Sequence, residues 1–239
     1  MSCILNIETS TSVCSVALSM DGEVLFAKAS FDGPSHAALL GVFVEEALSV
    51  LKKKGKKALD AVAVSSGPGS YTGLRIGVSV AKGLCFGFGI PLIGIHTLDI
   101  MAATVNSKGD SKIVSITDNC LYCAMLDARR MEVYAAIYDA SLKPVRETKA
   151  DIVEAGTYAS YLEKGKVCFF GNGASKCKSV ITSPNAIFIE DIHPLAVNMI
   201  PLSEQAFAAG KFEDTAYFEP FYLKEFQATV AKNKVLLAR

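Results

Sequence analysis

The sequence lacks an excess of positive charge, since its 239 residues carry 24 Lys plus Arg against 24 Asp plus Glu. Proteins that bind nucleic acid on their own usually have a basic excess, because neutralised phosphates supply much of the affinity. The balance therefore argues against a stand-alone nucleic-acid-binding protein. Apolar residues make up 51% of the chain, which excludes intrinsically disordered and collagen-like classes.

Targeting signals are also lacking. The N-terminus has neither the basic region nor the apolar run of a secretory signal, so we expect a cytoplasmic protein. The odd count of seven cysteines then favours reduced thiols. Residues 76–95 are apolar enough to suggest a membrane span, but Lys82, Gly83, Gly87, Gly89 and Pro91 interrupt them. A helix, a turn and a buried strand explain this stretch better, and no membrane partner is expected.

Catalytic motifs are missing as well. There is no GxSxG nucleophile motif, and His36, His96 and His193 show no two-histidine metal spacing. We interpret each histidine as a capping or core residue. Cys120 and Cys123 have CxxC spacing without a second pair, so two structural strand-end cysteines are favoured over a zinc or redox site. The residues thus predict no catalytic group and no metal site.

Strands and helices alternate along the chain. Hydrophobic patterns and turn signals in the first half predict strands at 3–8, 14–20, 23–27, 61–65 and 91–95 and helices at 35–54, 71–88 and 97–105, with Ser35 and Thr97 as caps. The second half predicts strands at 113–117, 122–127, 132–138, 142–148 and 167–170 and a helix at 151–163.

The two halves repeat one pattern: a strand, an acidic residue, a hairpin, a helix, a strand and a glycine turn. Glu8 and the turn Gly67–Gly69 in the first half correspond to Asp127 and the turn Gly171–Gly173 in the second. Such a duplication predicts an α/β fold of two lobes, each a mixed sheet with helices on its faces. This architecture is similar to the actin-like (ASKHA, ribonuclease H-like) proteins. We expect one lobe at 1–105, completed by a segment from about 205–239, and a second at 106–204.

The helices 35–54 and 71–88 are more apolar than a helix lying on a sheet requires. Their apolar arcs reach about 180° or more, against a stripe of about 100° for one buried face. A deeply buried central helix is one explanation, and a partner on the second face is the alternative that we favour. The residues predicted for that partner interface are Leu40, Phe43, Val44, Ala47, Tyr71, Leu74, Arg75, Val78, Ala81, Lys82 and Cys85.

Some loops have the composition of ligand-binding turns. Glu8-Thr9-Ser10 resembles a first phosphate loop, and the glycine turns could let a ligand approach the backbone, although tight turns alone would also explain them. The candidate remnants of nucleotide loops are Glu8, Thr9, Ser10, Gly67, Gly69, Asp127, Gly171 and Gly173. The basic residues within 52–57 are interpreted as a solvated helix end, with an RNA phosphate contact as the alternative.

Several segments together resemble one family. The stretch 65–77 (SSGPGSYTGLRIG), with IETS at 7–10, Ser35-His36, DARRMEVY at 127–134 and PFYL at 220–223, resembles TsaB, also called YeaZ, of the glycoprotease-like superfamily. The resemblance implies an actin-like fold and a role in placing threonylcarbamoyl on the adenosine beside the anticodon of tRNAs. It further implies a non-catalytic subunit that binds the paralogue TsaD and TsaE, while TsaC supplies threonylcarbamoyl-adenylate.

One departure from TsaD bears on activity. TsaD carries an HxxxH metal pair, whereas His36 is followed by Leu40 in this sequence. The resemblance therefore implies that ATP and metal bind partner subunits and that this chain has no cofactor of its own. We expect contact with tRNA through the complex and a homodimer when the chain is alone. The alternative hypothesis is a nucleotide-dependent kinase-like protein or a glycoprotease-like hydrolase.

Overall fold

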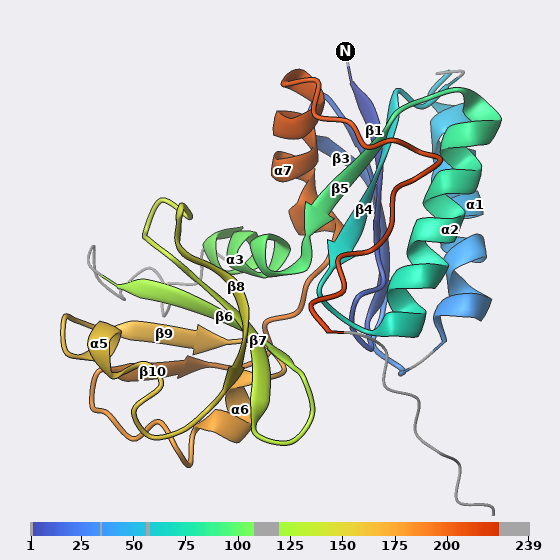
Figure 1. The fold of residues 1–239 in the computed structure, drawn as a ribbon. Helices are drawn as coiled ribbons and strands as arrows, with labels where there is room; N and C mark the ends of the chain where they lie inside the picture. The colour runs from blue at the N-terminus through green and yellow to red at the C-terminus, as the bar shows by residue number, and fades with distance from the viewer. Residues whose placement is uncertain (1, 34, 56–57, 108–119, 225–239) are drawn as a thin grey trace, which may run out of the picture.

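Two five-stranded sheets with helices on their faces form the two lobes of the protein (Figure 1). The structure is a computed structural model that describes residues 2–33, 35–55, 58–107 and 120–224. The predicted strand at 113–117 lies outside the described residues. No helix in the described ranges is long and apolar enough to cross a membrane.

The first sheet has the strand order β3-β2-β1-β4-β5. Its strands are β1 (Cys3–Glu8), β2 (Cys14–Met20), β3 (Glu23–Ser30), β4 (Ala61–Gly67) and β5 (Leu92–His96). β1 pairs with β2 in antiparallel register and with β4 in parallel register.

The second sheet repeats this arrangement, with the strand order β10-β9-β6-β7-β8. Its strands are β6 (Leu121–Asp127), β7 (Glu132–Tyr138), β8 (Pro144–Ile152), β9 (Val167–Phe170) and β10 (Ala186–Ile189). β6 pairs antiparallel with β7 and parallel with β9, as β1 does with β2 and β4. The predicted duplication and the actin-like α/β fold class are thereby confirmed.

Helices cover both faces of the first sheet, and this explains why every residue of β1 is buried. α1 (His36–Lys53) and α2 (Tyr71–Phe88) lie side by side on one face, where Leu5 and Ile7 point. α7 (Ala196–Ala208) packs on the other face, where Ile4 points. Alternate residues of one strand thus serve two separate cores.

The second sheet is covered in the same way. α3 (Thr97–Ser107) packs on the face of Ala124 and Leu126. The short helices α5 (Ala159–Leu162) and α6 (Ala174–Cys177) cover the opposite face.

The C-terminal part of the described chain returns to the first lobe. The Glu204 carboxylate on α7 accepts hydrogen bonds from Ser19 Oγ and from the Gly22 N–H, both at 3.1 Å. Beyond α7, the segment 211–224 runs along β5 and α2, and the Phe221 N–H donates to the Ser66 carbonyl at 2.6 Å. We expected a C-terminal completion of this lobe from about residue 205, and the lobe boundaries themselves stay predictions.

Three local expectations are wrong or incomplete. The predicted helix at 151–163 is mostly absent, because β8 continues through Ile152 beside β7 and only Ala159–Leu162 is helical. Ser35 precedes α1 without capping it, since its hydroxyl donates to the Gly33 carbonyl at 3.2 Å. α6, β10 and α7 are elements that we did not predict.

Candidate functional site

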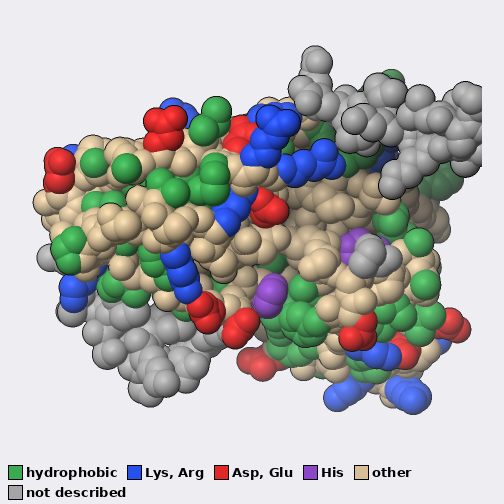
Figure 2. Space-filling model, turned by 90° about the horizontal axis from the view of Figure 1, so that it is seen from below, with side chains coloured by type: hydrophobic (Ala, Val, Ile, Leu, Met, Phe, Trp, Pro, Cys, Tyr) green, Lys and Arg blue, Asp and Glu red, His purple; other side chains and the backbone are tan. Residues whose placement is uncertain are grey.

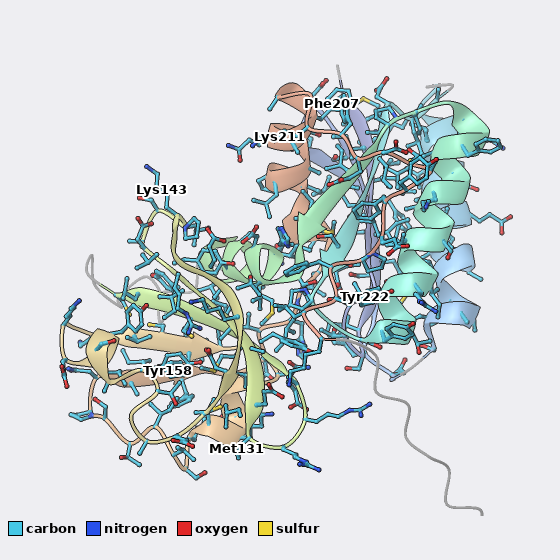
Figure 3. The ribbon with its side chains drawn as sticks, in the orientation of Figure 1. Met131, Lys143, Tyr158, Phe207, Lys211 and Tyr222 are labelled. Carbon is cyan, nitrogen blue, oxygen red and sulfur yellow. The ribbon has the colours of Figure 1, made fainter. Side chains whose placement is uncertain are left out.

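A cleft of ≈ 1640 Å³ opens between the two lobes. On the first lobe it is lined by the loop 10–12 after β1, the turn 68–70 and the start of α2. On the second lobe it is lined by the β6–β7 turn and by Asn172, while residues 221–224 border it as well. Figure 3 shows Tyr222 beside the first turns of α2, at this boundary.

The loop that follows β1 is held by a buried carboxylate. Glu8 is fully buried, and its Oε1 accepts a hydrogen bond from the Ser10 N–H at 2.8 Å. Its Oε2 and the buried Ser10 hydroxyl have no hydrogen-bond partner among the described residues. Burial raises the pKa of the Glu8 carboxyl to about 7, and the hydrogen bond from the Ser10 N–H only partly opposes this shift.

The first glycine turn touches this loop directly. The Ser70 N–H donates to the Ser10 carbonyl at 2.6 Å. A Cβ added to Gly69 would lie 2.3 Å from the Ser10 carbonyl oxygen, and one added to Gly73 would lie 2.1 Å from that of Thr9. These glycines therefore allow two segments of the chain to meet, and the space that a phosphate loop would leave open is filled by backbone.

The second glycine turn behaves similarly. A Cβ on Gly171 would lie 2.4 Å from the Met125 carbonyl oxygen, and one on Gly173 would lie 2.8 Å from the Leu126 carbonyl carbon. Contacts within the chain thus account for both glycines. Of the predicted loop residues, Ser10, Gly69 and Asp127 line the cleft, whereas Glu8, Thr9, Gly67, Gly171 and Gly173 are not among the lining residues.

His36 has a structural contact at the start of α1. Its Nε2 lies 2.7 Å from the Thr11 carbonyl oxygen, which supports the interpretation as a core histidine. Leu40, one turn later, is buried in the first core. In the part of the chain that the structure describes, no three His, Cys, Asp or Glu side chains form a group that could hold a metal.

Most of the predicted interface residues face inward. The apolar arc that we assigned to a partner packs on the chain's own first sheet, because burying it there removes the largest apolar area from water. The buried members are Leu40, Phe43, Val44, Ala47, Leu74, Val78, Ala81 and Cys85. The prediction that these eight side chains form a surface of the free chain is therefore wrong, because they are buried.

The polar members of the predicted interface hold the C-terminal segment. Lys82 Nζ donates to the carbonyls of Ala216 and Phe218 at 2.9 and 3.2 Å. Arg75 Nε donates to the Tyr222 hydroxyl at 3.2 Å, and its guanidinium lies 4.1 Å from the centre of the Tyr71 ring. Tyr71, Arg75 and Lys82 therefore hold the segment 216–222 against α2.

The opposite side of the two helices carries small and apolar residues that were not among the predicted interface residues. We call it the outer helix face, and it comprises the exposed residues Gly41, Val42, Gly83 and Gly87, with Ile76 and Val80 at its edge, where they are half-buried against the first core. Val42 is 47% exposed, and a Cβ added to Gly41, Gly83 or Gly87 would meet nothing within 4 Å. Residues 76, 80, 83 and 87 follow a helical spacing, and that spacing is the signal that could have identified this face.

Comparisons with known proteins agree on one family. The family model described as "TsaD: tRNA N6-adenosine threonylcarbamoyltransferase" matches residues 32–232. The tRNA threonylcarbamoyladenosine biosynthesis protein TsaB of Escherichia coli (strain K12) is 32% identical, over 92% of this chain and 94% of that protein. TsaB of Buchnera aphidicola subsp. Acyrthosiphon pisum is 28% identical, over 86% of this chain and 93% of that protein.

A solved structure gives the same answer. YeaZ from Pseudomonas aeruginosa superposes with a TM-score of 0.73 and 26% identity, and the match covers 93% of this chain and all of that chain. Sequence and fold thus agree over nearly the whole length. The chain belongs to the superfamily that the TsaD model describes and, within it, to the TsaB (YeaZ) family.

Proposed function

We propose that this chain is a non-catalytic scaffold subunit in the synthesis of tRNA threonylcarbamoyladenosine and that it docks on TsaD through the outer helix face. The observation that carries the proposal is the set of three helix glycines, Gly41, Gly83 and Gly87, that no contact with another described residue explains. Each glycine inside a helix costs about 1 kcal/mol relative to alanine. By contrast, Gly73 and Gly77 of α2 are explained by close contacts with Thr9.

The glycines suit the close approach of another helix. The distance between packed helix axes depends on the side chains at the contact, and glycines shorten it. The relatives' name, tRNA threonylcarbamoyladenosine biosynthesis protein, supplies the pathway. Since the family model describes TsaD, a TsaD subunit would offer helices of related geometry as the partner surface.

A catalytic role has little support in the site. Leu40 stands where TsaD carries its second histidine, and it belongs to the core. Among the described residues, backbone fills the space in front of both glycine turns, which supports assigning nucleotide binding to the partner subunits. We therefore assign ATP and metal binding to the partner subunits and include TsaE in the complex. We place the activity of this complex in the cytoplasm. Without TsaD, the same face would form a homodimer.

Reconstitution tests the proposal. tRNA modification is measured with TsaC, TsaD and TsaE, with and without this chain, and with this chain replacing TsaD. We expect modification only when this chain and TsaD are both present. Equal modification without this chain, or transfer in the absence of TsaD, would contradict the scaffold role.

A further inference from the structure

The turn between β6 and β7, residues 128–131, has an unusual backbone. Arg129 and Arg130 both have positive φ, 69° and 44°. Positive φ is unfavourable for residues other than glycine, asparagine and aspartate. Hairpins that need two consecutive residues with positive φ usually use Asn-Gly. The turn therefore holds two arginines where other residues would close it more easily, which suggests that the guanidinium groups are needed.

Lys176 of α6 fixes this turn. Its Nζ donates to the carbonyls of Arg130 and Glu132 at 2.7 and 2.6 Å and pairs with the Asp127 carboxylate. Asp127 Oδ1 also accepts a hydrogen bond from the Arg129 N–H at 3.0 Å. Figure 3 shows Met131, the last residue of the turn, next to α6. The carbonyls are thus drawn inward, and charge-assisted hydrogen bonds offset the backbone strain.

Both arginines are available for a ligand. Their side chains are exposed, and among the described residues no carboxylate pairs with either guanidinium. The neighbouring cations are engaged, since Lys176 is held as above, Lys224 pairs with Glu132 and Arg75 binds Tyr222. Figure 2, a view from below, shows Lys and Arg side chains grouped on this face of the molecule.

The other side of the cleft mouth is also favourable to anions. Arg129 and Arg130 line the cleft together with the first residues of α2. The first turn of this helix has no acidic residue, and a helix N-terminus carries a partial positive charge. An extended, negatively charged chain would therefore meet the two arginines on the second lobe and the partial positive charge of the α2 N-terminus on the first.

We infer that the Arg129–Arg130 turn is a contact for the phosphate backbone of tRNA in the modification complex. The inference rests on the proposed function, because a role in tRNA modification is what makes tRNA the expected ligand. Guanidinium groups bind phosphate oxygens in a forked geometry, and a turn fixed by Lys176 presents two of them with little loss of freedom. The neutral net charge fits an auxiliary contact, one that adds to a binding surface supplied mainly by TsaD.

The test replaces the turn with Arg129→Asn and Arg130→Gly, residues that accept positive φ and so preserve the fold. Gel filtration first establishes that wild type and variant bind TsaD equally. The affinity of each complex for unmodified tRNA is then measured by fluorescence anisotropy at several salt concentrations. We expect about tenfold weaker binding. We also expect the negative slope of log affinity against log salt to become shallower by about 1 to 2.

The control Lys52→Gln with Lys53→Gln removes two charges at the far end of α1, and we expect it to leave affinity and slope unchanged. Unchanged affinity and slope for the turn variant would overturn the inference, as would weaker binding to TsaD with unaltered affinity for tRNA, which would assign the arginines to a protein contact. If the wild-type chain does not bind TsaD, the proposed function fails. The same titration on the chain alone at low salt then still decides the role of the arginines.

Discussion

Thr9 and Gly73 are joined at the point where the first loop meets α2. Thr9 Oγ1 donates to the Gly73 carbonyl at 2.8 Å, and a Cβ on Gly73 would lie 2.1 Å from the Thr9 carbonyl oxygen. The contact leaves no room for a side chain at residue 73. It also separates two kinds of glycine in one helix, those required by the chain itself and those with open space before them.

This difference predicts opposite effects for two alanine substitutions. Gly73→Ala forces apart two backbone segments and should lower the free energy of unfolding by about 2 kcal/mol. Gly83→Ala removes only the conformational cost of glycine and should raise that free energy by about 1 kcal/mol. Urea unfolding followed by circular dichroism measures both. Destabilisation by Gly83→Ala would show that this glycine has an internal role.

Glu8 predicts a pH dependence of stability. Its pKa rises from 4.5 in the unfolded chain to about 7 in the folded one, because burial disfavours the ionised form. The folded state then binds more protons between these values, so stability is fully present below pH 4.5 and falls as pH rises through 7. The loss is at most roughly 3 kcal/mol. In unfolding experiments from pH 5 to 8, Glu8→Gln should remove this decline, and an unchanged slope in that variant would contradict the assignment.

A third prediction concerns the thiols. Cys120 Sγ lies 2.8 Å from Cys168 Sγ on the neighbouring strand, whereas Cys123 lies in the core of the opposite face of the sheet. Mild oxidation with a diazene dicarboxamide, which takes up the two hydrogens, should therefore link Cys120 to Cys168. Peptide mapping identifies the pair, and Cys168→Ser should abolish it. A bond between Cys120 and Cys123 would instead revive the redox interpretation of the CxxC motif.

Sequence reasoning found elements whose local signals agree with their packing. α2 was predicted as 71–88 and has these bounds, since a glycine turn precedes it and Gly89 follows it at φ 66°. α7 was missed because Pro201 interrupts its pattern, yet packing on the first sheet stabilises it. The predicted helix at 151–163 failed at its start because Asp151 and Ile152 pair with β7, and a turn occupies residues 155–158.

The candidate site was harder to predict for a geometric reason. Periodicity showed that α1 and α2 are unusually apolar, but it could not say which arc faces the sheet. Val78 is buried, so Val78→Glu would place a charge in the core and disturb the fold rather than test an interface. The cleft depends on residues from both lobes, and no sequence spacing relates Ser10 to Arg129.

The docking claim has a direct test in Gly83→Met, which fills the outer helix face with a good helix former while leaving the core intact. The matched control is Lys211→Met, because Lys211 lies near α7 in Figure 3, away from the outer helix face. Calorimetric titration with TsaD should show at least about tenfold weaker binding for Gly83→Met, by steric exclusion, with a free energy of unfolding no lower than that of the wild type. Lys211→Met should bind as the wild type does. Wild-type affinity in the Gly83→Met protein would contradict docking through this face.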